Sequence, residues 1–389
     1  LIMKIAIYHN LGAGGGKRVF FEYARELSKS HHVDLYILSE DAEKFADMRG
    51  VVKETFDYGF KEKKNDLFLL KVLKSKRNQK RIAADIDAKN YDVVLTGHCS
   101  LTKAPLILRY LKTPSVYYCQ EPFRDFYEYS IYKSRYATLP ILPRVKYVSR
   151  MVFKGLLDRS NALRATLIIA NSYFSAEAIY RAFGVCPRVS YLGVDASYFK
   201  FLPEVEKTNE VLSVGPLDSK KGHMFIIRAL GKIDANFRPV LNIVYYGEVA
   251  GYKEVLQKEA DNLGVVVRFN QNLSDDKIVD LYNKVKITLC AQELEPFGLT
   301  PLESMSCGTP VIAVREGGMK ETVIDDYNGL LIDRVESDFG LVVERVLRDR
   351  ELWEKLRDNG IEFIKNWNWE KQTERLLDRF TDVAVNKTS

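Results

Sequence analysis

Short apolar runs alternate with amphipathic stretches along the whole chain, a pattern typical of parallel α/β folds. The chain opens with an apolar run at 4–8 and a glycine-rich stretch at 10–16. A segment from 17 to about 30 follows, whose apolar residues recur at helical spacing, and then a second apolar run at 33–38. The order strand, glycine-rich loop, helix, strand predicts the start of a doubly wound parallel sheet.

The alternation continues to about residue 200, stops, and begins again. In the first part we expect further strands at 91–96, 115–119, 165–171 and 189–192. In the second part we expect strands at 211–215, 241–247, 265–269, 286–292 and 310–314, and helices at 275–285, 338–360 and 367–380. The polar, proline-containing segment 201–209 predicts a linker. With 389 residues, two α/β domains are expected, 1–200 and 210–365, followed by a terminal segment 366–389.

Composition supports a folded globular chain and excludes some classes. The sequence is 46% hydrophobic and 28% charged, as in ordinary globular proteins. It has no apolar run of 18 or more residues and leads straight into a strand, so we expect no membrane-spanning helix and no leader. The five cysteines form no C-x-x-C pair, which argues against a disulfide framework or a zinc site and favours a cytoplasmic location.

Charge is distributed unevenly between the two halves. Residues 1–200 carry 33 Lys+Arg and 20 Asp+Glu, net +13, and the remainder carries 25 and 32, net −7, which sums to +6. The excess is concentrated in two segments where basic and apolar residues are interleaved, Lys61–Arg81 and Tyr132–Arg164. Each fits a solvated helix face, but two in one basic half favour peripheral contact with an anionic membrane surface. No nucleic-acid-binding signature accompanies them, so we expect no nucleic-acid partner.

A loop between the strands at 286–292 and 310–314 carries the main candidate chemistry. Its sequence is Glu295-Pro-Phe-Gly-Leu-Thr-Pro-Leu-Glu303. Thr300 and the following proline predict a helix start with Thr300 as the N-cap. The free amides at such a start attract a phosphate, and flanking carboxylates accept hydrogen bonds from sugar hydroxyls. The alternative is a simple capping box, in which Glu303 only bonds the cap amide.

The longer segment from Glu295 to Ala313 closely resembles the E-x7-E segment of family 4 glycosyltransferases. The resemblance implies the GT-B fold, with two Rossmann-like domains that face a cleft and a last helix that crosses back to the first domain. It implies that Glu295 binds the hydroxyls of the donor sugar and Glu303 the ribose. The neighbouring residues Phe297, Gly298, Leu299 and Thr300 would line the donor site.

Two other loops of the second half resemble the same family. Gly215-Pro-Leu-Asp-Ser-Lys-Lys221-Gly matches a loop that usually reads Gly-Arg-Leu-x-x-x-Lys-Gly. The match implies that Lys221 contacts the donor diphosphate, with Lys220 as a further candidate. Pro216 replaces the arginine and provides neither a cation nor an amide donor. The turn that begins at Phe269 and Asn270 is similar to the family's base-binding turn, where backbone atoms hold the base.

Resemblance in the first half is looser and concerns the acceptor. Gly15-Gly16-Lys17-Arg18 partly matches the family's first loop, which implies that the glycines lie beside the donor phosphates and that Lys17 and Arg18 lie near the acceptor. A plain strand-to-helix turn is the alternative. His98 and Glu121 follow strands, where ligands of open α/β sheets bind. His98 also matches a strand-end histidine of the family, although a structural histidine is the alternative.

We therefore expect a retaining hexosyltransferase with a nucleotide-sugar donor and a lipid-linked or membrane-associated glycan acceptor. Catalytic roles are expected for His98, Lys221 and Glu295. No Asp-x-Asp stands at the expected site, so no metal and no other cofactor is expected. Two alternatives stay open. One is a sugar-nucleotide epimerase or hydrolase of the same fold, and the other is a non-catalytic nucleotide-sugar- or lipid-binding protein, which the loss of the arginine at Pro216 would favour.

Overall fold

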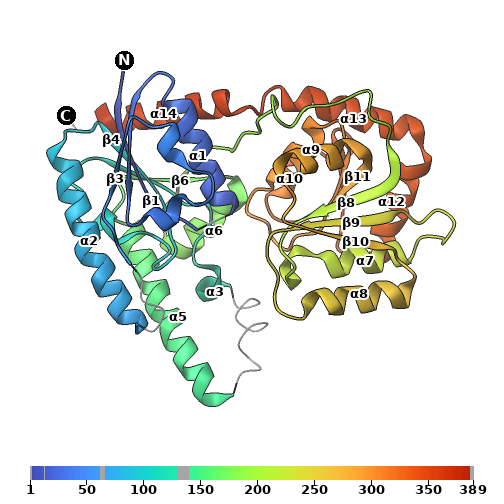
Figure 1. The fold of residues 1–389 in the computed structure, drawn as a ribbon, viewed down its shortest axis with the longest axis horizontal. Helices are drawn as coiled ribbons and strands as arrows, with labels where there is room; N and C mark the ends of the chain where they lie inside the picture. Colours follow the sequence, from blue (N-terminus) through green and yellow to red (C-terminus); the bar gives the residue numbers. More distant parts are fainter. Residues whose placement is uncertain (1, 13, 62–65, 129–139, 386–389) are drawn as a thin grey trace. The chain divides into compact units, whose positions relative to one another are not determined.

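The computed structural model describes residues 2–12, 14–61, 66–128 and 140–385. It divides into two compact units, each built on its own parallel sheet (Figure 1). The first unit contains Leu1–Tyr191 and Gln372–Ser389, and the second contains Leu192–Lys371. The chain therefore changes unit at residue 192, earlier than the boundary expected at 200.

Seven parallel strands form the sheet of the first unit, in the order β3-β2-β1-β4-β5-β6-β7. The strands are β1 (Lys4–Asn10), β2 (His32–Ile37), β3 (Glu54–Asp57), β4 (Val93–Cys99), β5 (Ser115–Tyr118), β6 (Leu167–Ala170) and β7 (Arg188–Val189). The helices are α1 (Gly15–Leu27), α2 (Phe68–Ala88), α3 (Arg124–Tyr127), α5 (Ile141–Ala162) and α6 (Tyr173–Phe183), with 3-10 turns η1 (Glu40–Glu43), η2 (Met48–Gly50) and η3 (Leu106–Arg109). The strand order reverses direction between β1 and β4.

Six parallel strands form the sheet of the second unit, in the order β10-β9-β8-β11-β12-β13. They are β8 (Thr208–Val214), β9 (Val240–Tyr245), β10 (Val267–Gln271), β11 (Val285–Cys290), β12 (Val311–Val314) and β13 (Gly329–Ile332). The helices are α7 (His223–Gly231), α8 (Tyr252–Leu263), α9 (Asp275–Lys284), α10 (Leu299–Ser306), α11 (Met319–Thr322), α12 (Glu336–Arg348) and α13 (Arg350–Ile364), with the 3-10 turn η4 (Ser219–Lys221). The last helix, α14 (Trp369–Val385), begins in this unit and continues into the first.

Helices cover both faces of each sheet, so the strands are buried and form the core of each unit. In Figure 1, α7 and α8 lie on one face of the second sheet and α9 and α10 on the other. Strands of this kind need apolar residues on both sides rather than at alternate positions. The segment Val93-Val94-Leu95 in β4 is fully buried, as are Ile287 and Leu289 in β11. The α/β class with two Rossmann-like units, predicted from the sequence, is confirmed.

Four local features differ from what the sequence led us to expect. β3 was missed because it is a half-exposed edge strand with little apolar character. The expected helix at 338–360 is two helices, since Asp349 caps the second one by accepting from the Leu352 amide at 3.0 Å. The expected linker at 201–209 is shorter, because β8 already begins at Thr208. The expected cap at Thr300 is taken by Gly298.

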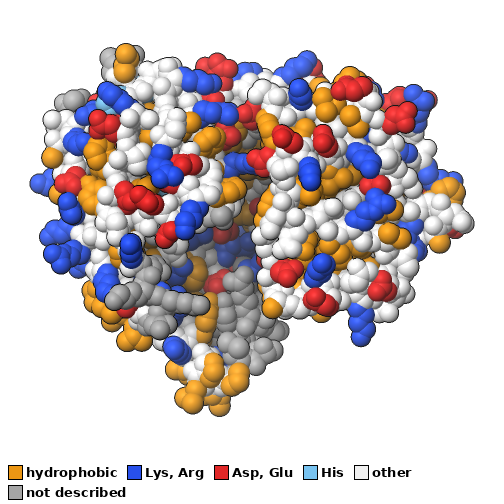
Figure 2. Space-filling view, in the orientation of Figure 1, with side chains coloured by type: hydrophobic (Ala, Val, Ile, Leu, Met, Phe, Trp, Pro, Cys, Tyr) orange, Lys and Arg blue, Asp and Glu red, His pale blue; other side chains and the backbone are white. Residues whose placement is uncertain are grey.

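Helices α2 and α5 form a surface of the first unit that is both apolar and basic. The Phe68 and Phe153 rings meet edge to face at 6.1 Å, and the Arg150 guanidinium lies 4.5 Å from the Phe68 ring centre. Exposed apolar side chains surround this contact, and Figure 2 shows a group of them at the start of α5. We call this surface the α2–α5 face; its exposed apolar members are Leu67, Leu69, Leu70, Leu73, Ile141, Leu142, Val145, Val152, Phe153 and Leu156.

The two basic-apolar segments predicted from the sequence thus meet on one surface. Parts of them, 62–65 and 132–139, lie outside the described residues. In the part of the chain that is described, no helix combines the length and the apolar character needed to cross a membrane.

Candidate active site

The fold brings the predicted donor loops of the second unit together at one point of the sheet. In the order β10-β9-β8-β11-β12-β13 the chain reverses direction between β8 and β11. Open α/β sheets bind ligands beyond the carboxyl ends of the strands at such a switch point. The loop at 215–222 follows β8, and the loop at 291–298 follows β11. Lys221 and Glu295, which are 74 residues apart, therefore become neighbours.

Lys221 and Glu295 form an ion pair across these two loops. The Lys221 Nζ lies 2.9 Å from Glu295 Oε2, and about a quarter of each side chain is exposed. The two loops are also joined by their backbones, since the Glu293 amide donates to the Lys220 carbonyl at 2.8 Å. Gly222 has a φ of +72°, and a Cβ there would lie 2.0 Å from the Ala291 carbonyl oxygen. Only glycine permits this approach.

The Glu295 backbone is held from the other side by the turn after β12. The Gly318 amide donates to the Glu295 carbonyl at 2.7 Å. A Cβ on Gly317, whose φ is +58°, would lie 2.5 Å from that same carbonyl oxygen. Leu294, directly before the glutamate, has a φ of +49°, which is unusual for a leucine and typical of strain held at functional sites. The Glu295 side chain is thus presented by a tightly fixed loop.

Helix α10 begins directly behind this loop. Its N-cap is Gly298, with a φ of +93°, so Thr300 lies within the first turn and the capping-box alternative for Glu303 is wrong. The Glu303 carboxylate instead accepts a hydrogen bond from the buried Tyr282 hydroxyl at 2.9 Å. The start of an α-helix attracts anions through its amides and its dipole. Leu299 and Thr300, both partly exposed, would bring those amides to a ligand.

The side chains of several predicted donor residues make contacts within the protein. Phe297 is buried, and its ring packs against Trp367 at 5.9 Å. Phe269 packs edge to face on Tyr245 at 6.4 Å. The Asn270 amide donates to the Arg268 carbonyl at 3.1 Å. Any contact that Phe297 makes with a ligand would therefore involve its backbone.

The phosphate side of the predicted donor site lies on the loop after β8. Gly215 has a φ of +154°, and the Lys221 side chain packs over it, since a Cβ there would lie 3.1 Å from Lys221 Cδ. Pro216 is exposed and Lys220 partly exposed. His223 is buried beneath the loop and contacts the Gly215 carbonyl at 3.1 Å. Burial lowers the pKa of His223 to about 4, so this histidine supports the loop as a neutral ring.

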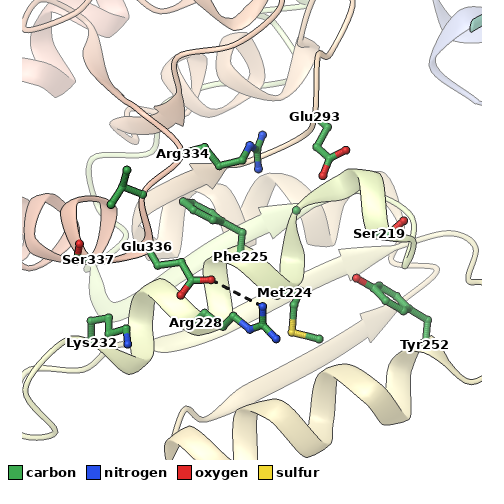
Figure 3. Close-up of a pocket in the computed structure, with 12 residues that line it drawn as sticks. Ser219, Met224, Phe225, Arg228, Lys232, Tyr252, Glu293, Arg334, Glu336 and Ser337 are labelled. Carbon is green, nitrogen blue, oxygen red and sulfur yellow. Dashed lines mark ion pairs between the residues drawn. The ribbon is translucent and has the colours of Figure 1, made fainter. Parts of the chain in front are cut away.

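A pocket of about 760 Å³ opens on the helix side of the same loop. Figure 3 shows Met224, Phe225 and Tyr252 around it, with Arg228 and Arg334 pointing toward it. Neither Lys221 nor Glu295 lines this pocket. It is therefore separate from the pair at the switch point, and we do not assign the donor to it.

The first unit repeats the switch-point geometry between β1 and β4. The glycine loop follows β1, and Gly15 and Gly16 form the first turn of α1. A Cβ on Gly16 would lie 2.9 Å from Gln120 Oε1, so the loop approaches the end of β5 closely. His98 lies at the end of β4, and Glu121 follows β5. The structure thus brings the glycine loop, His98 and Glu121 to one edge of the sheet.

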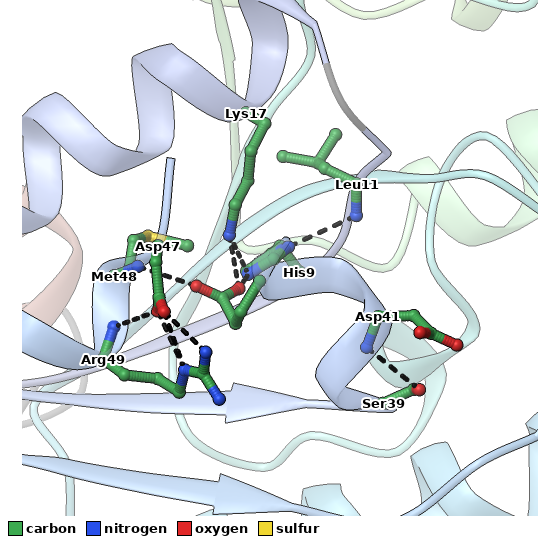
Figure 4. Close-up of polar contacts among 9 residues, drawn as sticks. His9, Leu11, Lys17, Ser39, Asp41, Asp47, Met48 and Arg49 are labelled. Atoms are coloured by element: carbon green, nitrogen blue, oxygen red, sulfur yellow. Dashed lines mark hydrogen bonds and ion pairs between the residues drawn. The ribbon is translucent and has the colours of Figure 1, made fainter. Parts of the chain in front are cut away.

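Lys17 was predicted on the acceptor side, and the structure corrects this. Its side chain is fully buried and forms an ion pair with Glu43, beside His9 (Figure 4). Glu43 also accepts from the Met48 amide at 2.7 Å and contacts His9 Nε2 at 2.7 Å. The amine points under the loop rather than toward a ligand, because an unpaired carboxylate at Glu43 would be costly to bury.

The protonation of this cluster follows from its contacts. His9 Nδ1 accepts from the Leu11 amide at 3.2 Å, which leaves the proton on Nε2 and makes it the donor to Glu43. Burial lowers the pKa of His9 to about 4. Burial alone would raise the pKa of Glu43, but the hydrogen bonds it accepts outweigh this and lower that pKa. A neutral histidine, a carboxylate and a lysine therefore anchor the glycine loop. Arg18, the next residue, is partly exposed and remains an acceptor-side candidate.

Two family models match adjoining parts of this chain. The model described as Glycosyltransferase Family 4 matches residues 13–198, and the model described as Glycosyl transferases group 1 matches residues 195–363. Together they cover residues 13–363, which contain both parallel sheets apart from β1. The chain is a member of family 4 of the glycosyltransferases. The second-half motifs that carried the closer resemblance lie in the region of the second model.

Relatives of this family 4 member match it over part of their length. A D-inositol 3-phosphate glycosyltransferase of Thermobifida fusca is 30% identical over 241 residues, 56% of each chain. An uncharacterized glycosyltransferase of Methanocaldococcus jannaschii is 32% identical over 161 residues, 41% of this chain and 44% of its own. The chain thus spans about half the length of the curated relatives it matches.

Solved structures resemble the family 4 chain over its full length. Sucrose-phosphate synthase of Thermosynechococcus elongatus superimposes with a TM-score of 0.77 at 18% identity, covering 100% of both chains. HepE of Anabaena in complex with UDP has a TM-score of 0.71 at 19% identity, covering 98% of this chain and 100% of its own. At this level of identity the likeness establishes the fold, which is the GT-B class.

Three residues of the site region were not found from the sequence. Arg334 binds Glu316 with two hydrogen bonds of 2.8 and 2.7 Å and donates to the Ala291 carbonyl at 3.1 Å, which fixes the end of β11. Tyr282 holds Glu303, as described. Lys103 lies 3.0 Å from Glu121 and has a φ of +64°. Each acts on a partner far away in the chain, so no local spacing could have indicated it.

Proposed function

We propose that this protein is a retaining glycosyltransferase that takes a sugar from a nucleoside-diphosphate donor held by the second unit. The observation that carries the proposal is the Lys221–Glu295 pair, 2.9 Å apart at the switch point and next to the start of α10. A donor needs a cation for its diphosphate and an acceptor for its sugar hydroxyls, and the pair presents both. HepE, a structural neighbour, was solved with UDP, which supports a nucleotide and makes uridine the first base to test.

Charge builds on the diphosphate as the sugar–phosphate bond breaks. In our proposal the Lys221 ammonium and the first amides of α10 stabilise that charge, and fixed dipoles do so without reorganising. Glu295 accepts hydrogen bonds from the sugar and orients it, a positioning role that the rigid loop supports. Glu303, held by Tyr282, would bind the ribose. This division of roles requires no metal and no cofactor.

Retention is proposed to arise by attack from the side of the leaving group. The departing phosphate then takes the proton of the acceptor hydroxyl, so no protein base is needed. This fits the state of His98, whose pKa is lowered well below its usual value by burial and by the charges of Lys103 and Lys154. A ring that stays neutral can donate or accept a hydrogen bond but does not supply a charge.

The acceptor is proposed to be a lipid-linked or membrane-associated glycan that meets the first unit. The α2–α5 face combines exposed apolar side chains with basic residues on the same two helices. Apolar side chains of such a surface enter the interface of a bilayer. Each Lys or Arg near an anionic bilayer adds roughly 1 kcal/mol of attraction. The protein would therefore work as a peripheral protein on a membrane.

A two-step experiment tests the proposal. A thermal-shift panel of UDP-, GDP- and ADP-sugars identifies the donor, because a ligand far above its Kd raises the unfolding free energy by a few kcal/mol, ~2.7 at 100-fold excess. NMR then follows the donor with the purified protein. Transfer of the sugar to an added glycolipid acceptor with its anomeric configuration kept supports the proposal. Transfer with inversion contradicts retention. Release of free sugar alone indicates a hydrolase, and conversion to an isomeric nucleotide sugar indicates an epimerase. Stabilisation without turnover, with vesicles and glycolipid present, indicates a binding protein.

A further inference from the structure

A buried tyrosine lies directly behind the carboxylate that is proposed to bind the ribose. Tyr282, on α9, is fully buried, whereas Glu303, on α10, is partly exposed. The Tyr282 hydroxyl donates to Glu303 Oε2 at 2.9 Å. Because the tyrosine has no exposed surface, it can act on a ligand only through Glu303.

The proton of this hydrogen bond belongs to the tyrosine. Burial raises the pKa of Tyr282 well above its usual value, and the negative charge of Glu303 raises it further. The phenol is therefore the donor, and a hydrogen bond to a charged acceptor is strong and directional. A carboxylate offers about four acceptor positions, so Glu303 can keep the Tyr282 bond while it binds ribose hydroxyls. The tyrosine thus fixes the plane of the carboxylate without blocking it.

Tyr282 is itself held in place by two buried residues from other segments. Its carbonyl accepts a hydrogen bond from Thr309 Oγ1 at 2.6 Å. Its ring packs edge to face on Phe199, with 6.1 Å between the ring centres. The Phe199 carbonyl accepts in turn from the Ser306 hydroxyl at the end of α10. The segment before β8 therefore joins α9 to α10, and such packed supporting contacts hold a binding group to the precision that a site needs.

We propose that Tyr282 is a positioning residue, which aligns the Glu303 carboxylate with the ribose hydroxyls and so makes the donor site select ribonucleotides over deoxyribonucleotides. This role rests on the proposed function, in which Glu303 meets the ribose. A site with a fixed acceptor rejects an analogue that lacks the matching hydroxyl, because the acceptor is then left without its partner. A carboxylate that could rotate into solvent would discriminate less.

Calorimetric titration with two ligands tests the role of Tyr282. The first ligand is UDP, GDP or ADP, whichever the thermal-shift panel selects, and the second is its 2′,3′-dideoxy analogue, which keeps the base and the diphosphate. We expect the wild type to bind the ribonucleotide at least about tenfold more tightly. Tyr282→Phe should lower this preference by roughly three- to tenfold, the weight of one hydrogen bond, and leave the affinity for the analogue unchanged. Tyr252→Phe removes a hydroxyl from a partly exposed tyrosine of the same unit and should keep the full preference.

Three features of the design separate positioning from stability. The preference is a ratio of two affinities, and a smaller folded fraction weakens both ligands equally. In a Glu303→Gln background, Tyr282→Phe should have little further effect on the preference, because the two side chains act as one unit. Phe199→Leu loosens Tyr282 without removing its hydroxyl, and it decides the question where Tyr282→Phe does not fold. It should lower the same preference, though less than Tyr282→Phe.

The other outcomes overturn this role. An unchanged preference in Tyr282→Phe, or an equal loss of affinity for both ligands, shows that the tyrosine is only structural. An equal loss of preference in Tyr252→Phe shows that the effect is not specific to the residue behind Glu303. Wild-type protein that binds both ligands equally rejects the ribose role of Glu303 and the role of Tyr282 with it, but leaves nucleotide binding in place. Wild-type protein that binds no nucleoside diphosphate rejects the glycosyltransferase proposal itself.

Discussion

Lys221 Nζ and Glu295 Oε2 lie 2.9 Å apart although the two residues are 74 positions apart in the chain. Both side chains are about one quarter exposed, so an ion pair in this place gains little stability by itself. The backbone nevertheless holds them together with three close approaches, at Gly222, Gly317 and Gly318. A pair that is rigidly held but adds little stability fits a binding site, where Lys221 and Glu295 can each give up the other and bind a ligand instead.

Removing either charge of this pair should abolish most of the activity. We expect Lys221→Gln and Glu295→Gln each to lower kcat/KM for the donor by roughly 10²–10³-fold, the usual loss when a stabilising group of a transition state is removed. Lys258→Gln, an exposed lysine on α8, is the control. Steady-state kinetics with the identified donor measure the effect. Unchanged kcat/KM in both variants would show that Lys221 and Glu295 do not belong to the donor site.

Gly317 should be needed to position the Glu295 loop. Gly317→Ala places a methyl group 2.5 Å from the Glu295 carbonyl oxygen and forces a φ of +58°, which costs an alanine ~1–2 kcal/mol. Gly251→Ala has a similar φ of +79° and open space around it, so it matches the backbone cost without the clash. We expect Gly317→Ala to lose more stability in urea than Gly251→Ala, because the backbone clash adds to the shared cost of the positive φ, and we expect a loss of donor turnover in Gly317→Ala only. Full turnover in Gly317→Ala would contradict the positioning role of this turn.

Glu43 should be essential for folding of the first unit. Glu43→Ala leaves the buried ammonium of Lys17 without its partner, and breaking a buried pair in this way costs ~3–5 kcal/mol. The double variant Lys17→Met/Glu43→Leu removes both charges and should regain part of that loss. Asp41→Ala changes an exposed acid of the same 3-10 turn and should be neutral. Urea denaturation measures all three, and a neutral Glu43→Ala would show that Lys17 does not depend on this carboxylate.

The α2–α5 face should bind anionic vesicles. Leu142→Ser with Val145→Ser removes two exposed apolar residues of α5. Loss of their partial burial, ~1–2 kcal/mol in all, should lower the partition coefficient by about tenfold. Val255→Ser with Leu341→Ser changes an exposed valine and an exposed leucine of the second unit and should have no effect. Flotation with anionic and neutral vesicles, at low and high salt, measures it. Vesicle binding that is the same for anionic and neutral lipid, at low and high salt, and in both double variants would contradict a membrane-facing role for these helices.

The fold and the donor loops could be predicted because their signals are local. Buried strands of a parallel sheet are continuous apolar runs, and Glu295 and Lys221 belong to contiguous motifs. Because the sheet is parallel, the carboxyl ends of its strands lie at the same edge, so loops that follow different strands are expected to be neighbours. The helix start was misplaced from Gly298 to Thr300 because a threonine before a proline is a common cap signal. The left-handed backbone that lets Gly298 take this position depends on tertiary contacts.

The role of Lys17 could not be predicted for a different reason. The local sequence around a lysine in a glycine loop does not show whether its side chain faces a ligand or the protein interior. Its partner Glu43 is 26 residues away and reaches it only because β2 lies beside β1. The same holds for Lys103, which meets Glu121 across neighbouring strand ends. The contact partners of such isolated charged residues can be identified only when the strand order is known.

The location of the bound nucleotide decides whether Lys221 and Glu295 form the donor site. A crystal structure of the protein with the donor nucleotide of the thermal-shift panel would show it. We predict that the diphosphate lies between Lys221 and the amides at the start of α10, with Glu295 beside the sugar position. A nucleotide bound instead in the pocket lined by Phe225, Arg228 and Arg334, or away from both, would contradict this prediction.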